Sequence, residues 1–278
     1  MRVIVNVDDL GLHPAVRRAV EDLGRIGIVT SSTLLVNGPD AEQAAKTTGV
    51  GLGVHLNILR GRPTLPPDEV GSLVGPDGLF LGDYTALFKR YLTGRIDHGQ
   101  VEREWTAQVE RARELGVSPT HFDSEKHIHA WPTLMAVAAR VAGKFGVGWL
   151  RRPVECQKLA RVDAGGLRAK FLGVCSLFQK RPARVRWPDL AFGIADQGRF
   201  LLPERFRAYA ARAPKARVVE IVCHPGKPLP GDPDIPAEYG KLRVAAQWEA
   251  EYKALSDPEW LRVLGEMGAK LVHYGQMP

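Results

Sequence analysis

The sequence predicts an α/β fold, a closed or nearly closed (β/α) barrel of mostly parallel strands that forms a single domain over residues 1–278. The first observation is that short β-branched runs alternate with runs that repeat apolar residues at helical spacing, which is typical of βα units. The second is length, because 278 residues is long for one sandwich or helical bundle and ordinary for one α/β barrel. Roughly seven such units favour a closed or nearly closed barrel over an open sheet.

The predicted elements follow one another from the N-terminus. We expect strands at residues 3–7, 32–36, 52–56 and 120–123, near residue 149, and at 217–222 and 270–273. We expect helices at residues 15–26, 41–45, 101–115 and 132–145, and a last helix that opens at 256–259. There Ser256 or Asp257 can cap the first N–H groups, and Pro258 fits the first turn. Residues 57–100 and 153–205 interrupt the pattern with Pro and Gly, which predicts long loops facing a substrate or small insertions.

The composition is that of a soluble globular protein, with 45% hydrophobic and 25% charged residues. No run approaches the roughly 18 apolar residues that a membrane span needs. The chain opens with Met-Arg and passes directly into a strand pattern, so we expect no secretory leader and a cytoplasmic protein. Three widely spaced cysteines, Cys156, Cys175 and Cys223, match neither a disulfide framework nor a paired-thiolate zinc site. Any metal would therefore depend on His and carboxylates.

The formal net charge of +7 permits attraction to nucleic acid or to an anionic surface. The Lys and Arg residues are nevertheless spread along the chain, and their one local cluster, residues 179–186, is short and interrupted by Pro182. A solvated loop is the ordinary interpretation of such a cluster. We therefore expect neither a nucleic-acid partner nor a membrane partner, and the sequence leaves a homo-oligomer open.

Unusual polar residues fall at the carboxyl ends of the predicted strands, the edge that holds the active site in parallel α/β folds. Taken singly, each has a structural interpretation: adjacent aspartates can cap a following helix, and a lone His after a strand is more often structural than a ligand. Together they would need independent reasons at four strands, which favours one shared site. The residues concerned are Asp8, Asp9, His55, Asn57, those of 121–129, and His224.

Residues 121–129 form the densest group of ligand-type side chains. In an extended backbone alternate side chains face the same way, so His121, Asp123, Glu125, His127 and His129 would project to one side. If the chain leaves the strand after Asp123, the projection changes, but two or three of these groups can still reach a shared point.

Basic and aromatic residues near the strand ends are candidates for substrate contacts. Arg151 or Arg152, just after the strand near residue 149, could contact a substrate or bridge a surface carboxylate. For any one aromatic residue core packing is the commoner role. The candidates for sugar stacking are Tyr84, Trp131, Trp149, Trp187 and Phe192.

These motifs resemble those of the YdjC-like carbohydrate deacetylase family. The matching stretches keep the family's order from residue 2 to residue 226: VNVDDLGL at 5–12, GIVTSST at 27–33 with VNG at 36–38, GVHLN at 53–57, PTHFDS at 119–124 with HIH at 127–129, and EIVCHP at 220–225. The segment EMGAKLV at 266–272 looks like the family's last helix and strand. Each motif is short, but together and in order they are specific.

The resemblance implies a distorted barrel, a divalent metal ion and hydrolysis of an N-acetyl group from an amino sugar or chitooligosaccharide. It also implies roles for individual residues. Asp9 and His55 look like metal ligands, Asp8 like the general base, and His224 like the group that stabilises or protonates the leaving amine. Family members commonly carry His directly after Asp-Ser, where this chain carries Glu125.

The third metal ligand is thus the main question that the sequence raises. We predict that Glu125 takes this place, because a carboxylate can bind at about 2.0–2.2 Å and two ligands alone hold a metal poorly. The alternative is that His127 or His129 is the ligand. A second carboxylate would favour Mg²⁺ or Mn²⁺ over Zn²⁺. Around the substrate or the ligands we expect Asn57, Asp123, His127, His129 and Arg152.

Hydrolysis of an amide needs an activated water, stabilisation of the oxyanion and an acid for the leaving amine. A metal site of carboxylates and imidazole can supply the first two. We therefore predict a metal-dependent N-deacetylase acting on a small carbohydrate. Two alternatives are a metal hydrolase of another amide or ester on the same scaffold, and a non-catalytic sugar-binding or metal-binding protein.

Overall fold

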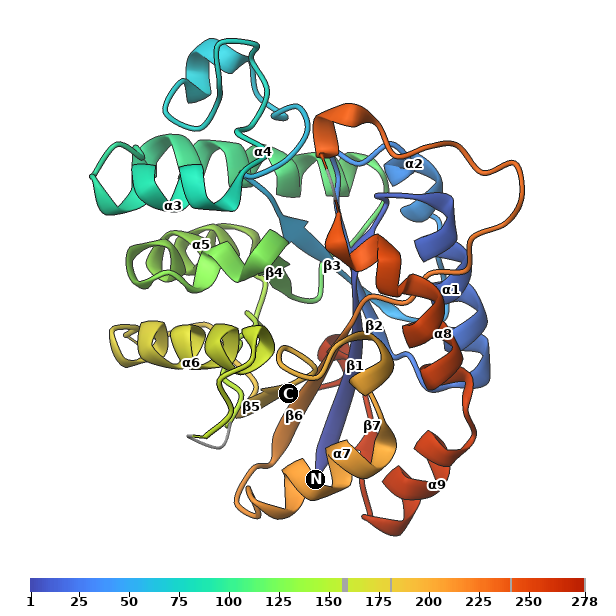
Figure 1. Cartoon of the computed structure of the whole chain (residues 1–278). Helices are drawn as coiled ribbons and strands as arrows, with labels where there is room; N and C mark the ends of the chain where they lie inside the picture. Colours follow the sequence, from blue (N-terminus) through green and yellow to red (C-terminus); the bar gives the residue numbers. More distant parts are fainter. Residues whose placement is uncertain (157–159, 181, 241, 278) are drawn as a thin grey trace.

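The computed structural model describes residues 1–156, 160–180, 182–240 and 242–277, and it shows a curled sheet of parallel strands with helices around it (Figure 1). The strands lie in the order β4-β3-β2-β1-β6-β5, and β7 pairs with the start of β1. Their bounds are β1 Arg2–Leu10, β2 Ser31–Leu34, β3 Gly51–Leu56, β4 Phe122–Ser124, β5 Leu190–Phe192, β6 Val218–Cys223 and β7 Lys270–Leu271. The predicted α/β fold with mostly parallel strands is confirmed.

The sheet curls far enough for short segments to connect its edge strands β4 and β5. Phe122 in β4 pairs with Leu150, and Trp149 pairs with Arg186, both in parallel. The Leu150 N–H donates to the Arg186 carbonyl at 2.9 Å. These short segments stand where regular strands would complete a ring, so the barrel is distorted, as the family resemblance implied.

Helices form the outer layer of the molecule. Their bounds are α1 Pro14–Ile26, α2 Ala41–Ala44, α3 Tyr84–Leu92, α4 His98–Glu114, α5 Pro132–Phe145, α6 Ala164–Leu177, α7 Pro203–Ala211, α8 Trp248–Ser256 and α9 Glu259–Glu266. The two regions that interrupt the sequence pattern hold regular elements, since α3 lies within 57–100, and α6 and β5 lie within 153–205. In the part of the chain that the structure describes, no helix is both long enough and apolar enough to cross a membrane.

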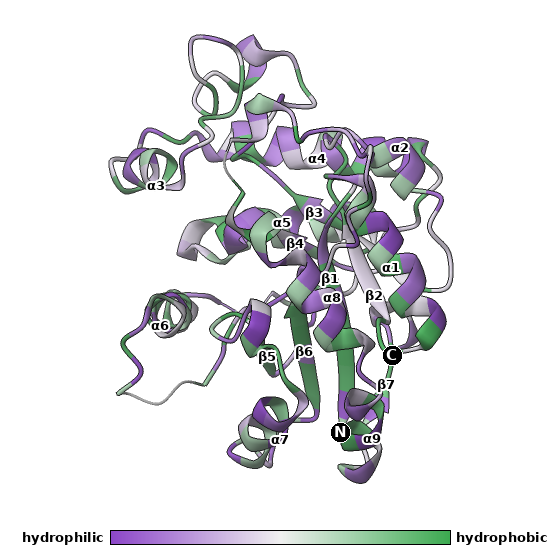
Figure 2. Ribbon diagram, turned by 45° about the vertical axis from the view of Figure 1, so that its right-hand side comes forward, coloured by the Kyte–Doolittle hydropathy of each residue, from purple (hydrophilic) through white to green (hydrophobic). Residues whose placement is uncertain are grey.

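Burial explains why β1 and α1 form where they do. From Val3 onward, β1 is buried on both faces, as expected for a central strand under helices, and Figure 2 shows β1 and β6 as hydrophobic ribbons inside the molecule. The buried residues of α1 recur at helical spacing on one side. Its N-terminus is capped by His13, whose Nδ1 accepts the Ala15 N–H at 3.1 Å. The cap therefore comes from His13, which leaves Asp8 and Asp9 for other contacts.

The turn after β1 depends on two glycines whose backbones lie against each other. Gly11 has a φ of +98°, and a Cβ there would stand 2.9 Å from the Leu35 carbonyl oxygen. A Cβ on Gly38 would stand 2.3 Å from the Gly11 carbonyl oxygen. This close approach holds the end of β1, which carries the aspartate pair, against the loop after β2.

We expect Gly11→Ala to lower the free energy of unfolding by more than Gly27→Ala does. Both glycines have positive φ, +98° and +87°, and this backbone region costs Ala about 1–2 kcal/mol. A Cβ at Gly27 meets nothing within 4 Å, whereas a Cβ at Gly11 also meets backbone. Denaturant unfolding of the two variants measures the difference, and equal losses would show that the turn after β1 relaxes without cost.

Candidate active site

Side chains from the ends of several strands line one pocket of about 540 Å³. Its polar floor comes from β1, β3, the turn after β4 and the residue that follows β6. The opposite wall comes largely from α6. The polar residues of the floor are Asp8, Asp9, His55, Glu125, Lys126, His127 and His224. The strand ends that the sequence singled out therefore meet in one cavity.

Asp8 and Asp9 both reach the pocket because the backbone changes direction at the end of β1. Successive side chains of a regular strand point to opposite faces. Asp9 has a φ of +62°, and the pairing of β1 with β2 shifts register between Val7 and Leu10. This irregularity brings two adjacent carboxylates into one cavity, a strained conformation of the kind found at functional sites.

His55, in β3, has carboxylates on both sides of its ring. Its Nδ1 lies 2.7 Å from Asp123 Oδ1, while its Nε2 lies 3.3 Å from Asp9 Oδ1 and 3.8 Å from Glu125 Oε2. Burial lowers the pKa of the His55 ring, but these carboxylates, Asp123 foremost, raise it well above 6.5. A ring nitrogen that faces two carboxylates is stable when a cation lies between them, either a proton or a metal ion.

Asp9, His55 and Glu125 form a group that fits a divalent ion. Their ligand atoms lie within 4.8 Å of one another, and all three residues are buried. Imidazole nitrogen and carboxylate oxygen are ligands that Zn²⁺ and Mn²⁺ accept, and carboxylates also suit Mg²⁺. The structure thus brings the three residues predicted as ligands to a common point.

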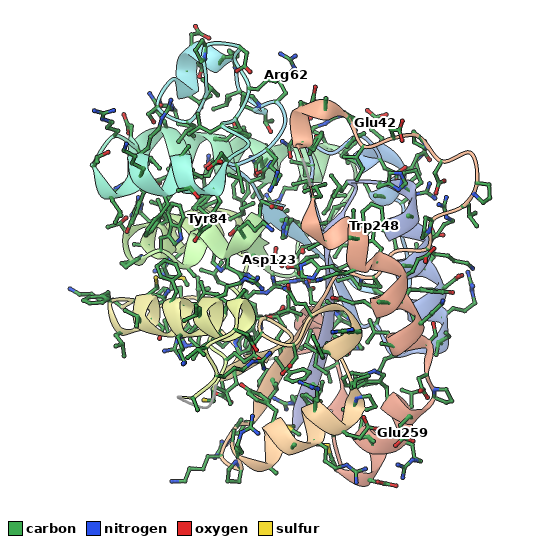
Figure 3. All side chains as sticks on the ribbon, in the orientation of Figure 1. Glu42, Arg62, Tyr84, Asp123, Trp248 and Glu259 are labelled. Carbon is green, nitrogen blue, oxygen red and sulfur yellow. The ribbon has the colours of Figure 1, made fainter. Side chains whose placement is uncertain are left out.

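Asp8, His55 and Asp123 form a second group of similar dimensions. The Asp123 carboxylate is already in use, because Oδ1 faces His55 and Oδ2 lies 2.9 Å from Thr33 Oγ1 and 2.8 Å from Arg151. Figure 3 shows Asp123 in the middle of the fold, among side chains from several strands. Asp123 therefore suits the position behind a ligating histidine, where a carboxylate accepts the hydrogen of the other ring nitrogen.

The chain leaves the strand after Ser124, so the predicted row of side chains is extended only as far as Asp123. A short 3₁₀ turn, η2 (Glu125–Ala130), follows at once, and within it Lys126 and His127 have φ of 51° and 56°. This left-handed pair turns residues 125–127 toward the pocket, which they line.

The last two histidines of this segment have different surroundings. His129 Nδ1 lies 2.6 Å from Ser124 Oγ and its Nε2 lies 2.9 Å from the Arg151 carbonyl, so both ring nitrogens are engaged inside the fold. Burial lowers the pKa of His129 to about 3. His127 lines the pocket, and its buried Nδ1 has no hydrogen-bond partner among the described residues. The geometry leaves His127, and not His129, available to a bound molecule.

Arg151 is the buried cation of the site, a role that the sequence could not separate from that of its neighbour. Its guanidinium donates to both oxygens of Asp8 at 2.6 and 2.7 Å and to Glu220 at 2.8 and 2.9 Å, and it lies 2.8 Å from Asp123. Burial raises the pKa of Asp8, but the paired guanidinium holds that pKa well below its usual range. Asp8 is therefore ionised at neutral pH.

Arg152 and most of the aromatic candidates lie away from the pocket. The Arg152 guanidinium stands 5.3 Å from the centroid of the Trp187 ring, and Arg152 does not line the pocket. Tyr84 lines it, whereas Trp131 and Phe192 are buried in the core. The buried arginine that contacts the site carboxylates is thus the residue before Arg152.

Asn57 and Arg60 help to position Glu125, the third candidate ligand. Asn57 Oδ1 accepts the N–H groups of Leu59 and Arg60, and its Nδ2 donates to the Arg60 carbonyl. Arg60, held in this way, donates from Nε to Glu125 Oε1 at 3.2 Å and from Nη1 to the Tyr239 carbonyl at 2.6 Å. Asn57 therefore shapes the loop after β3, and Arg60 offsets the charge of Glu125.

His224 stands beside Asp8 at the edge of the pocket. Its Nε2 lies 3.7 Å from Asp8 Oδ2. Its backbone N–H donates to the buried carboxylate of Glu251 in α8, and its Nδ1 lies 4.0 Å from the same carboxylate. The imidazole is thus held between two carboxylates, with Nε2 on the side of Asp8.

Comparison with known proteins identifies the family behind this geometry. The family model described as "YdjC-like protein" matches residues 2–266. The chain belongs to the YdjC-like family. Proteins named carbohydrate deacetylase are similar to it. The Homo sapiens protein is 31% identical, and the match covers 98% of this chain and 89% of the human protein. The Geobacillus stearothermophilus protein is 30% identical, and the match covers 98% of this chain and 96% of the bacterial protein. The Mus musculus protein of the same name is 34% identical, covering 82% and 79%.

A solved structure agrees with the YdjC-like fold of the chain. The crystal structure of a candidate cellobiose-phosphate cleavage protein from Enterococcus faecalis covers 98% of this chain and 97% of its own, with a TM-score of 0.73. The two sequences are 24% identical. At that identity the likeness concerns the fold alone.

The YdjC-like motifs account for the floor of the pocket and leave its α6 wall unexplained. Leu167, Phe171 and Leu172 of α6 line the same pocket as the carboxylates. Gly165 and Gly166 open this helix, and Pro and Gly interrupt the region around it, so its sequence gave no helix signal. The wall is thus a part of the pocket that sequence patterns did not reveal.

We expect Arg151→Gln to lower the free energy of unfolding by about 3–5 kcal/mol at neutral pH, because it leaves buried carboxylates without their cation. The depressed pKa of Asp8 stabilises the fold above the ordinary value of 3.8, and this contribution is lost as the pH falls through the lower folded value. The difference between Arg151→Gln and the unaltered protein should therefore shrink in acid.

Arg152→Gln is the matched control, since Arg152 lies over Trp187 and should contribute less than about 1 kcal/mol. Denaturant unfolding of both variants at a series of pH values gives the comparison. Equal losses for the two variants, or a loss for Arg151→Gln that does not change with pH, would contradict the role assigned to Arg151.

Proposed function

We propose that this protein is a metal-dependent carbohydrate deacetylase that hydrolyses the N-acetyl group of an amino sugar or chitooligosaccharide-like substrate. The observation that carries the proposal is the meeting of three ligand atoms, from Asp9, His55 and Glu125, beside Asp8 and His224 in one pocket. The names of the relatives in Homo sapiens and Geobacillus stearothermophilus support the same conclusion.

In this proposal Asp9, His55 and Glu125 hold one divalent ion, which when bound lowers the pKa of water and polarises the acetyl carbonyl. Asp123 accepts the Nδ1 hydrogen of His55, so that the Nε2 lone pair faces Asp9 and Glu125. Arg60 keeps Glu125 in place and offsets its charge. Two carboxylates favour Mg²⁺ or Mn²⁺, and the imidazole keeps the set compatible with Zn²⁺.

Asp8 is the general base of the proposed reaction. It is ionised, and Arg151 fixes both of its oxygens, so its position is set before the substrate binds. The same clamp makes Asp8 a weak base. A bound ion that acidifies the attacking water would narrow the gap between the pKa of that water and the pKa of Asp8, which makes the proton transfer less unfavourable.

His224 supplies the proton that the leaving amine requires. Its imidazole lies beside Asp8, and a histidine can carry and release a proton near neutral pH. His127 lines the pocket, and its ring can donate a hydrogen bond to the acetyl group or to the sugar. The tautomer of His127 is left free by the fold, so the substrate would select it.

The purified protein should release acetate from N-acetylated chitooligosaccharides. Treatment with a chelator should abolish the release, and Mg²⁺, Mn²⁺ or Zn²⁺ added singly should restore it, which also identifies the ion. Full activity in metal-free protein would contradict the metal site. Hydrolysis of other amides or esters alone would indicate a different hydrolase, and sugar binding without any turnover would indicate a binding protein.

Substitution should separate the metal ligands from the proton-transfer groups. Asp8→Asn and His224→Ala should keep metal affinity and fold while turnover falls by about 10²–10⁴-fold, because a general acid or base contributes that much. Asp9→Asn and Glu125→Gln should lose metal affinity itself. Calorimetric metal titration together with acetate release measures both quantities.

The variants at residue 125 also test which side chain is the third ligand. Glu125→His should restore metal binding and shift preference toward Zn²⁺, because imidazole replaces a carboxylate. Full metal affinity in Glu125→Gln, combined with a loss in His127→Ala, would transfer the third position to His127. Equal loss of metal in Asp8→Asn and Asp9→Asn would show that the roles of the aspartate pair are assigned wrongly.

A further inference from the structure

Helix α6 and its flanking residues present apolar side chains to solvent. Leu167 and Val174 are each 55% exposed and Leu177 is 80% exposed, while Val162 before the helix is 70% exposed and Phe178 after it is 68% exposed. We call these five residues the α6 face. Leu167, Val174 and Phe178 are separated by seven and then four positions, so they share one side of the helix. A group of exposed apolar side chains of this kind usually marks an interaction surface.

The α6 face is continuous with the wall of the pocket. Leu167 belongs to both, and Phe171, one turn further along the helix, also lines the pocket. The Phe171 ring packs edge-on against Phe88 of α3, with centroids 5.5 Å apart. In both orientations α6 lies at the outer edge of the molecule (Figures 1 and 2). A surface that covered the α6 face would therefore lie beside the mouth of the pocket.

The stretch of sequence that contains α6 is strongly basic. Between residues 160 and 188 the sequence has one acidic residue, Asp163, and its carboxylate is taken up by Arg161 at 3.0 Å and by the Gly166 N–H at 2.7 Å. The basic residues of the same stretch are Arg161, Arg168, Lys170, Lys180, Arg181, Arg184 and Arg186, of which Arg181 lies outside the described residues. Lys180 and Arg184 are exposed just after the α6 face.

We propose that the α6 face docks on an anionic lipid surface. Apolar side chains would enter the interfacial layer while neighbouring Lys and Arg meet acidic headgroups, the combination by which interfacial helices bind membranes. This departs from the expectation, drawn from composition, that the protein has no membrane partner. Composition could not show this surface, because basic residues occur along the whole sequence and the exposed apolar side chains come together only when α6 forms.

Charge complementarity favours a lipid surface over a second copy of the chain. Two copies joined through their α6 faces would bring two basic surfaces together, and like charges at an interface are unfavourable. An anionic surface instead neutralises them. Docking would turn the mouth of the pocket toward the lipid, and only this last consequence rests on the proposed function.

The test is co-sedimentation of the full-length protein with vesicles of phosphatidylcholine, alone or mixed with an equal amount of phosphatidylglycerol. We expect binding to the mixed vesicles that weakens as salt is added, and little binding to phosphatidylcholine alone. The double variant Leu177→Ser with Phe178→Ser should bind the mixed vesicles at least about tenfold more weakly, because two exposed apolar anchors are lost. Lys180→Glu with Arg184→Glu should weaken binding in the same direction.

Ile26→Ser is the matched control, because Ile26 is an apolar residue that is 47% exposed at the C-terminal end of α1, outside the α6 face. This variant should bind the mixed vesicles as strongly as the unaltered protein does. Neither Leu177 nor Phe178 lines the pocket, so acetate release from a soluble substrate should be unchanged in their double variant.

Folded protein that binds neither kind of vesicle would overturn the proposal, and so would a double variant that binds the mixed vesicles as strongly as the unaltered protein. A concentration-dependent dimer that the double variant abolishes, without vesicle binding, would assign the face to a second copy. Vesicle binding by a protein without deacetylase activity would contradict the proposed function and leave the docking intact.

Discussion

The interior of this barrel can hold three carboxylates near one another only because a single guanidinium lies among them. Arg151 contacts Asp8, Asp123 and Glu220 and is itself fully buried. Three isolated carboxylates in that volume would protonate or force the strands apart, since burying an unpaired charge is costly. The residues come from β1, β4 and β6 and from the segment that connects the edges of the sheet. One charge cluster therefore joins the strands and determines the ionisation of the candidate base.

The two arginines of the site, Arg151 and Arg60, pair with different acidic side chains. Arg151 pairs with Asp8, which keeps that carboxylate ionised, and Arg60 donates to Glu125, which offsets the charge of that carboxylate. Among the described residues no arginine forms an ion pair with Asp9, which shares the Nε2 side of the His55 ring with Glu125. The positive charge that this corner of the pocket requires is what an ion would supply. The arrangement of compensated and uncompensated carboxylates is compatible with the proposed division into a proton-transfer side and a metal side.

Sequence patterns predicted the strands other than β5, together with the strand-end residues, because both depend on local properties, namely β-branched periodicity and polar residues after apolar runs. They could not separate Arg151 from Arg152, because which of two adjacent side chains faces the interior depends on how residues 149–150 pair with β4 and with residue 186. The left-handed conformations of Lys126 and His127 were equally hidden, since nothing but the tertiary setting imposes them on these residues. Sequence patterns did not predict helix α6, because glycines open it and its apolar side chains are not confined to a buried face.

The pocket joins two kinds of surface that arise in different ways. Its floor is built from strand ends whose positions are fixed by backbone pairing on both sides, so the candidate ligands and proton-transfer groups have little freedom to move. Its wall is α6, which contributes apolar side chains and continues outward as the exposed α6 face. Chemistry on an acetamide depends on the rigid floor, because ligands and proton-transfer groups must be held to fractions of an ångström. Under the proposed function, contacts with the rest of the substrate would fall to the wall, whose side chains do not take part in the charge cluster of the floor.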